Sequence, residues 1–179
     1  MQTRNKIYFA SDFHLGAPNN NESIEREKKI CNWLDEISKD AEEIYLLGDL
    51  FDFWFEYKKV IPKGFERLKG KLAHLTDDGI KINLFIGNHD LWTFGYLENE
   101  LGLKIYKKPV IIKINNLIFY LAHGDGLGKG NQLFKFIKSI YQNPICQFLF
   151  KLLPSSIGIS LAQKLSNNNG CDSTATLNL

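Results

Sequence analysis

Short apolar runs that end abruptly in polar side chains recur four times along this chain. The runs IYFA, IYLL, INLFI and LIFYLA are rich in Ile, Leu, Phe and Tyr, which is typical of buried strands. The polar residues that follow these runs are Asp12 and His14, Asp49, Asn88 to Asp90, and His123 with Asp125. Because ligands bind at the carboxyl ends of strands in open α/β sheets, we expect the four strand ends to converge on one site.

The segments between these runs have the spacing of amphipathic helices. Apolar residues at Ile24, Ile30, Cys31, Leu34 and Ile37 predict one helix, and those at Phe65, Leu68, Leu72 and Leu75 predict a second that begins at Pro62 and stops at Asp78 and Gly79. With strands expected over 43–47 and 80–86, the β-α-β-α-β order predicts parallel strands joined by right-handed crossovers. After Pro109, VIIKI and LIFYLA flank Asn115 and Asn116, a two-residue connection typical of a hairpin. The predicted fold class is α/β, a layered α/β sandwich with a mixed or second sheet.

The last third of the chain returns to helical spacing over residues 131–166, with a break at Pro144 and interspersed lysines. One interpretation is a helical hairpin that packs on the core with its lysines in water. The other is a lid that offers apolar side chains to a lipid and lysines to anionic headgroups. The tail, residues 167–179, has no apolar period, so it is interpreted as disordered or as sequence that has lost its fold.

Composition narrows the class of protein. At 179 residues with 44% hydrophobic content, the chain is long enough to bury one substantial core, so we expect one domain. A net charge of +2 gives no reason to expect a nucleic-acid partner. Three widely spaced cysteines without a CxxC pair, no signal-peptide core and no apolar run of membrane-spanning length predict a cytoplasmic protein that meets membranes only at their surface.

The polar residues at the strand ends are of the types that hold divalent cations. Asp12 and His14 occupy alternate positions of one extended segment and can chelate one ion. Asn88 and His123 offer an amide oxygen and an imidazole to a second ion. Asp49 is the candidate for a bridging carboxylate, because two neighbouring ions can grip a phosphoryl group and activate a shared water. The pattern therefore predicts a dinuclear metal centre.

Three aspartates stand beside these candidate ligands. Asp52, Asp90 and Asp125 either hydrogen-bond the ring nitrogens of His14, His89 or His123, or cap the ends of strands. Nearby, the glycine-rich stretch 126–130 contains Lys129 and offers backbone amides to a phosphate, although a plain flexible turn explains the glycines equally well.

Three further residues of types that occur in active sites have simpler interpretations. His74 lies in an amphipathic helix, where a surface histidine is expected. Trp54 and Trp92 directly follow the polar clusters, and aromatic residues in such places are expected in the core beneath the site.

In this order, the motifs DxH, GDxxD, GNHD and HGD resemble the calcineurin-like metallophosphoesterase superfamily, and the resemblance covers about residues 6–165. It implies the superfamily's α/β fold and the attack of a metal-bound hydroxide on phosphorus. It also implies that His89 is the catalytic histidine, which stabilises developing charge or protonates the leaving oxygen.

Longer segments of the sequence resemble one family within this superfamily. GDLFDFWFEY, GNHDLW, AHGDGLGKGN and the run NPICQFLFKLLPSSIGISLAQKLS resemble the UDP-2,3-diacylglucosamine hydrolases of lipid A synthesis. This resemblance implies cleavage of the pyrophosphate of UDP-2,3-diacylglucosamine into UMP and 2,3-diacylglucosamine 1-phosphate, with two divalent metal ions, Mn²⁺ in that family. It further implies substrate contacts at Lys129 and Asn131 and a peripheral position on the cytoplasmic side of the inner membrane. A substrate with two acyl chains favours the lid interpretation, here for residues 127–166.

The chain departs from the superfamily pattern at one place. It contains no GHxH motif, which in the superfamily gives one histidine to each metal. We therefore expect residues 1–166 to be a metallophosphoesterase domain that is incomplete at its C-terminal end, with each metal one protein ligand short. Two alternatives are a metallophosphodiesterase for a soluble nucleotide or nucleic acid, and an inactive truncated membrane-surface module.

Overall fold

The computed structural model describes residues 4–57, 59–124, 139–140, 143–155, 157–158 and 160. Its largest sheet has four parallel strands in the order β1 (Lys6–Ala10), β2 (Ala41–Leu46), β3 (Lys81–Phe85) and β4 (Lys104–Tyr106). A second, antiparallel pair consists of β5 (Val110–Ile114) and β6 (Leu117–Leu121). The predicted α/β class, with parallel strands separated by helices, is confirmed.

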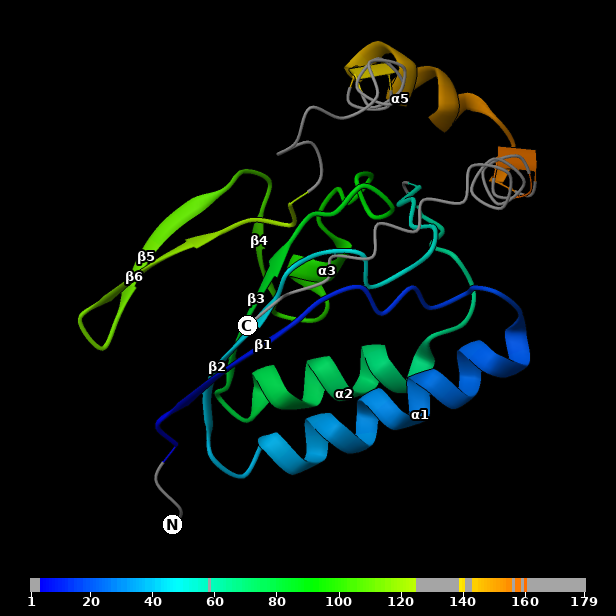
Figure 1. The fold of residues 1–179 in the computed structure, drawn as a ribbon. Coiled ribbons are helices and arrows are strands. Elements are labelled where there is room, and N and C mark those ends of the chain that lie inside the picture. Colours follow the sequence, from blue (N-terminus) through cyan, green and yellow to red (C-terminus); the bar gives the residue numbers. More distant parts are fainter. Residues whose placement is uncertain are drawn as a thin grey trace.

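Two long helices lie side by side on one face of the parallel sheet (Figure 1). α1 (Asn20–Ile37) begins after Asn19, whose side chain accepts a hydrogen bond from the Glu22 N–H and so caps the helix. α2 (Glu66–Asp77) packs next to it. Because right-handed crossovers connect strands that are added in one direction, both helices fall on the same face.

α2 begins at Glu66, later than the Pro62 start that the sequence predicts. Phe65 precedes the helix with a left-handed φ of +63°, so the helical conformation cannot extend back through it. Its side chain supplies no cap. Instead, buried Glu27 of α1 accepts a hydrogen bond from the Leu68 N–H over 3.0 Å, which satisfies a donor that the first helical turn leaves without a partner.

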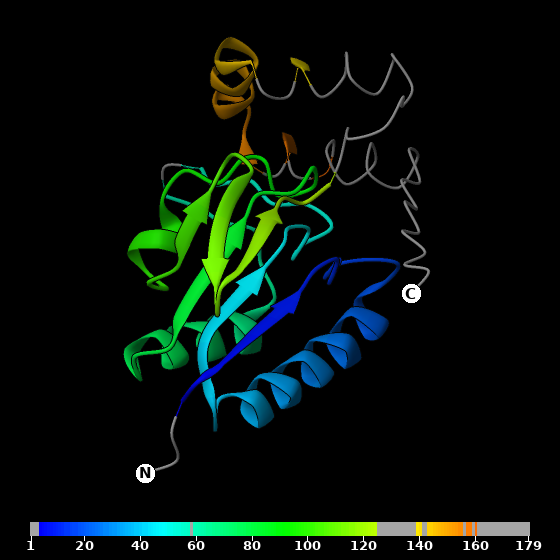
Figure 2. The ribbon, with the colours of Figure 1, turned by 60° about the vertical axis from the view of Figure 1, so that its left-hand side comes forward.

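Successive side chains of a strand point to opposite faces of the sheet, and each face is covered by a separate hydrophobic core. Ile44 and Leu46 of β2 face the core that the two helices cover, whereas Tyr45 and Phe85 face the opposite core, where they pack with Leu121 of β6. Figure 2 shows the hairpin on the side of the sheet away from α1 and α2. The layers are therefore helices, parallel sheet and hairpin, as the layered prediction requires.

The hairpin turn follows its prediction. Asn115 and Asn116 have φ of +46° and +68°, and a two-residue turn that matches the twist of its strands needs positive φ at both positions. The pattern of apolar residues does not predict α3 (Tyr96–Asn99) or β4. Elements of this length contain too few residues to show a period.

Most of the predicted lid lies outside the described residues, and so does the whole tail from 167 to 179. Within the lid, α5 (Pro144–Leu152) begins at the proline predicted as a break, and Asn143 caps it by accepting from the Ile145 N–H. Phe150 packs its ring on those of Phe55 and Trp92, at centroid distances of 4.8 and 4.7 Å. α5 is therefore held on the side where the parallel strands end (Figure 1).

The other side of α5 carries an exposed apolar face. This face consists of Ile145, Phe148, Leu149 and Leu152, which follow the spacing of one helical stripe. Among the described helices, none combines the length and the apolar character needed to cross a membrane.

Candidate metal centre

The carboxyl ends of β1, β2, β3 and β6 bring the five predicted metal ligands together. These residues are Asp12 and His14 after β1, Asp49 after β2, Asn88 after β3 and His123 after β6. In the sheet β2 lies between β1 and β3, so Asp49 occupies the middle of the row. His123 reaches the same point from the hairpin layer.

Asp49 is the centre of this cluster. Its Oδ2 lies 3.1 Å from Nε2 of His123 and 3.8 Å from Nε2 of His14. Its side chain is only 4% exposed, whereas that of Asp12 is 48% exposed, so the cluster is closed at Asp49 and open to solvent at Asp12. Burial by itself raises the pKa of Asp49, but the protonated form of His123 and the His89 N–H outweigh burial and lower it, which keeps the carboxylate ionised.

The ligand atoms form two overlapping triads. One contains Asp12, Asp49 and His123, the other contains His14, Asp49 and His89, and within each triad the atoms lie within 4.8 Å of one another. The pairs expected from the sequence are also close, with 3.6 Å between His14 Nε2 and Asp12 Oδ1. Asp49 belongs to both triads, as a bridging carboxylate would. His89 enters one triad as a further candidate ligand, in addition to the catalytic role that the family resemblance implies.

Two histidine rings are oriented by backbone carbonyls. Nδ1 of His123 donates to the Leu47 carbonyl and Nδ1 of His89 donates to the Asp52 carbonyl, each over 2.7 Å. In a neutral ring, a proton on Nδ1 leaves Nε2 as an electron-pair donor. Both rings therefore hold the tautomer that suits a metal ligand.

The surroundings of His123 provide a test of whether the residues fit a cation. Its Nε2 lies 3.1 Å from Oδ2 of Asp49 and 3.2 Å from Oδ1 of Asn88, and both of these oxygens are acceptors. When the His123 ring is neutral, its Nε2 has no proton, so Nε2, Asp49 Oδ2 and Asn88 Oδ1 face one another with lone pairs only. A bound cation stabilises such an arrangement, so the donor set fits a divalent metal ion.

Unusual backbone conformations occur at the same residues. Asp12, His14 and Asp49 have φ of +58°, +43° and +54°, a left-handed region that non-glycine residues rarely adopt. Gly87 makes room for one of these bends, because a Cβ there would overlap the Asp49 carboxylate and lie 2.6 Å from the Asp49 backbone nitrogen. Strain of this kind concentrates at functional sites, where surrounding contacts hold it in place.

Asp90 connects the two loops that carry Asp49 and His89. It is fully buried and accepts hydrogen bonds from the N–H groups of Leu50 and Gly87, over 3.1 and 2.6 Å. Burial, together with the charge of Asp49, raises the pKa of Asp90 to about 7. These contacts correspond to the capping alternative that the sequence left open for this residue.

Asp52 lies between two histidines. Its Oδ1 is 3.7 Å from Nδ1 of His89 and 3.9 Å from Nδ1 of His14, so the carboxylate is near both rings. The predicted residues Asp125, Lys129 and Asn131 lie outside the described residues.

The expectations for neighbouring residues are met. Trp54 and Trp92 are buried next to the site, and His74 is exposed on α2. Sequence reasoning missed Glu56, a buried carboxylate that accepts from the Trp54 indole and from the backbone N–H groups of Phe94 and Tyr96. It ties the segment after Asp52 to the segment after Asp90, and its only sequence signal is an acid inside the apolar run FWFEY.

Sequence comparison finds relatives over nearly the whole chain. A protein from Porphyromonas gingivalis is 37% identical over 164 residues, which is 91% of this chain and 63% of that protein. Relatives from Actinobacillus succinogenes (25% identity, 93% of this chain and 69% of that protein) and Pseudomonas aeruginosa (28% identity, 89% and 64%) also match. The chain thus spans less than two thirds of the length of the Porphyromonas gingivalis relative.

No family model matches the chain. Among solved structures, a protein of unknown function from Aquifex aeolicus aligns with a TM-score of 0.48 and 19% identity, over 75% of this chain and 68% of that one. The three relatives named above are all called UDP-2,3-diacylglucosamine hydrolase. The resemblance that the motifs indicate is therefore confirmed: this chain is similar in sequence to the UDP-2,3-diacylglucosamine hydrolases.

Proposed function

We propose that this protein hydrolyses the pyrophosphate bond of UDP-2,3-diacylglucosamine in lipid A biosynthesis, releasing UMP and 2,3-diacylglucosamine 1-phosphate. The observation that carries the proposal is the Asp49 carboxylate, whose Oδ2 faces Nε2 of both His14 and His123. A carboxylate with an imidazole on each side supports a two-ion centre for phosphoryl chemistry. The name that the relatives share supports the substrate.

Two divalent ions, proposed to be Mn²⁺, would be held by this chain's own residues. Asp12, His14 and Asp49 would hold one ion, and Asp49, Asn88 and His123 the other. Bound ions of this kind supply Lewis acidity and lower the pKa of a coordinated water. Asp49 would set the position of both sites, because it is the most buried of these ligands and is held by the His89 N–H.

His89 is proposed as the catalytic residue. The Asp52 carbonyl fixes its ring through Nδ1, and the ring belongs to the cluster with His14 and Asp49. When both ring nitrogens carry a proton, the Nε2–H can be donated to a phosphoryl or leaving-group oxygen as negative charge develops there.

For the whole chain we propose a calcineurin-like metallophosphoesterase fold, with residues 1–166 as the domain, 127–166 as its helical lid and 167–179 as a separate tail. The exposed apolar face of α5 supports a lid that contacts acyl chains and the surface of the cytoplasmic membrane. The packing of Phe150 on Phe55 and Trp92 would keep this helix near the metal centre.

The release of UMP from UDP-2,3-diacylglucosamine in the presence of Mn²⁺ tests the proposal. The same assay applies to a chimera that continues after Ser166 with the C-terminal region of the Porphyromonas gingivalis relative, of which the match covers 63%. We expect turnover that chelation by EDTA abolishes, and higher turnover in the chimera. If only water-soluble diesters are cleaved, the protein is a soluble phosphodiesterase. If vesicles bind and Mn²⁺ does not, it is a membrane-surface module.

A further inference from the structure

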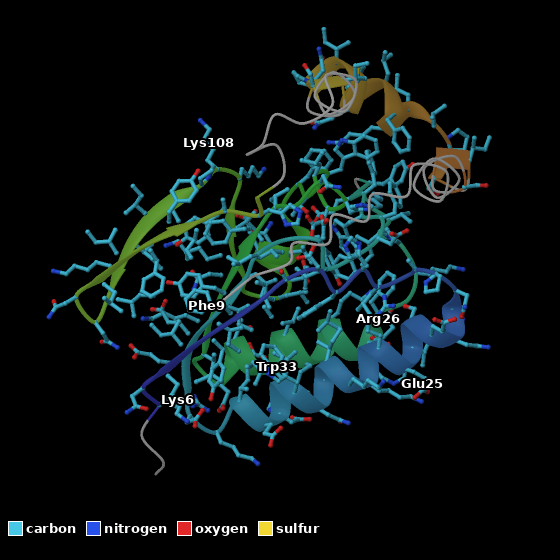
Figure 3. All side chains as sticks on the ribbon, in the orientation of Figure 1. Lys6, Phe9, Glu25, Arg26, Trp33 and Lys108 are labelled. Carbon is cyan, nitrogen blue, oxygen red and sulfur yellow. The ribbon has the colours of Figure 1, made fainter. Side chains whose placement is uncertain are left out.

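We propose that Arg26 is a positioning residue, which holds the loop that carries His14 in the conformation that the metal centre needs. The inference rests on the proposed metal-dependent function. Arg26 lies on α1, beneath the chain that leads from β1 into that helix (Figure 3). It belongs to none of the motifs that the sequence singles out.

One nitrogen of the Arg26 guanidinium forms hydrogen bonds with three backbone carbonyl groups of this loop. Nη1 donates to the carbonyl oxygens of Phe13, His14 and Ala17, over 3.2, 2.8 and 3.1 Å. Hydrogen bonds from a charged donor are stronger than those between neutral groups. The short His14 contact is the central one, so the guanidinium acts directly on the peptide of a candidate metal ligand.

The opposite side of the loop is held by different partners. The N–H groups of His14 and Leu15 donate to the carbonyls of Asp49 and Leu50, over 2.9 and 3.0 Å. The His14 residue is thus fixed at its N–H by the Asp49 segment and at its C=O by Arg26. With both ends fixed, the direction of the His14 side chain is determined by the backbone.

This double attachment explains how His14 keeps a left-handed φ of +43°. A β-carbon makes that conformation unfavourable, and it persists only where surrounding contacts outweigh the strain. Loss of the Arg26 contacts would let the loop relax toward ordinary φ values, which would move the imidazole away from Asp49. Because a positive charge is unfavourable near bound cations, the contribution of Arg26 to metal binding is geometric, through the loop.

Arg26→Ala, Arg26→Lys and the control Arg67→Ala test this role in the full chain. Arg67 is a matched arginine at the contact between α1 and α2, with one ion pair to Glu27 at 3.4 Å. Amide hydrogen exchange of the metal-free protein measures whether the N–H groups of His14 and Leu15 stay in their hydrogen bonds. Calorimetric titration with Mn²⁺ reports whether the site is formed.

We expect Arg26→Ala to speed exchange at both amides and to weaken Mn²⁺ binding by about 10- to 100-fold, the range typical for outer partners of metal ligands. Arg26→Lys should recover part of the affinity, because an ammonium group offers three N–H donors on a side chain that is one bond shorter. Arg67→Ala should change neither measurement.

The outcomes separate this inference from the proposed function. If Arg26→Ala binds Mn²⁺ as tightly as Arg67→Ala, or exchanges no faster at His14 and Leu15, the positioning role is wrong while the metal centre stands. If Arg26→Ala does not fold, Arg26→Met, which keeps an apolar stem but removes the N–H donors, carries the test, and wild-type Mn²⁺ affinity in that variant overturns the role. A wild-type chain that takes up no Mn²⁺ contradicts the proposed function, whereas the exchange rates still decide whether Arg26 holds the loop.

Discussion

The backbone N–H of His89 donates a hydrogen bond to Oδ1 of Asp49 over 2.9 Å. This contact joins the loop after β3 to the loop after β2 and fixes the rotation of the buried carboxylate. Oδ2 consequently faces the imidazoles of His14 and His123. The position that a bridging ligand would occupy is therefore set by the pairing of two neighbouring strands.

Replacing Asp49 with Asn should remove the metal centre and leave the fold. Asparagine keeps one oxygen that can accept from the His89 N–H, but it presents an NH₂ group to His14 and His123 in place of Oδ2. We expect Mn²⁺ affinity, measured by calorimetry, to fall by more than the roughly 10- to 100-fold that loss of an outer partner costs. Asp77→Asn, at an exposed position of α2, is the control. Unchanged Mn²⁺ binding by Asp49→Asn would contradict a ligand role for Asp49.

Replacing His89 with Ala separates catalysis from metal binding. As the proposed acid, His89 should contribute roughly 10²- to 10⁴-fold to turnover, and its loss should leave Mn²⁺ affinity close to that of the wild type. Turnover and calorimetric titration are measured on the same preparation, with His74→Ala on the exposed side of α2 as the control. If Mn²⁺ affinity falls together with turnover, His89 is a ligand of the triad with His14 and Asp49.

Gly87→Ala should both destabilise the protein and weaken the metal site. The added methyl group would collide with Asp49, and overpacking of this kind costs about 1–3 kcal/mol in free energy of unfolding. Gly70→Ala is the matched control, because a Cβ there meets nothing within 4 Å and a helical alanine should stabilise α2 by roughly 0.5–1 kcal/mol. Denaturant unfolding and Mn²⁺ titration measure the two effects. Equal stability of the two variants would show that the close approach of Gly87 to Asp49 is unimportant.

Polar substitutions on the exposed face of α5 should weaken binding to membranes. Phe148 and Leu152 are 60% and 66% exposed, and burying such a side chain in a lipid surface contributes about 1.5–3 kcal/mol. We expect Phe148→Ser and Leu152→Ser each to reduce binding to anionic phospholipid vesicles by roughly ten-fold or more in a sedimentation assay. Ile118→Ser, at an equally apolar exposed position of β6, should have no effect. Similar losses from Ile118→Ser would mean that α5 is not the membrane-binding surface.

The elements that the sequence predicted well are those whose signals are local. The apolar runs locate the strands, and Asn115 and Asn116 locate the hairpin turn through their tolerance of positive φ. The start of α2 was misplaced because it depends on the left-handed Phe65 and on Glu27, which reaches the helix from α1. A contact between two helices cannot be predicted from the pattern of apolar and polar residues within either helix.

The sequence by itself determined the chemical types of the candidate ligands and their places at the ends of strands, because strand periodicity and ligand chemistry are properties of neighbouring residues. Only the tertiary structure decided which atoms meet. The orientation of His123, for instance, comes from the Leu47 carbonyl, 76 positions away in the chain. The role of Arg26 likewise comes from the way α1 folds back under the loop that carries His14. Such contacts depend on strand order and helix packing, so they exist only once the layers have assembled.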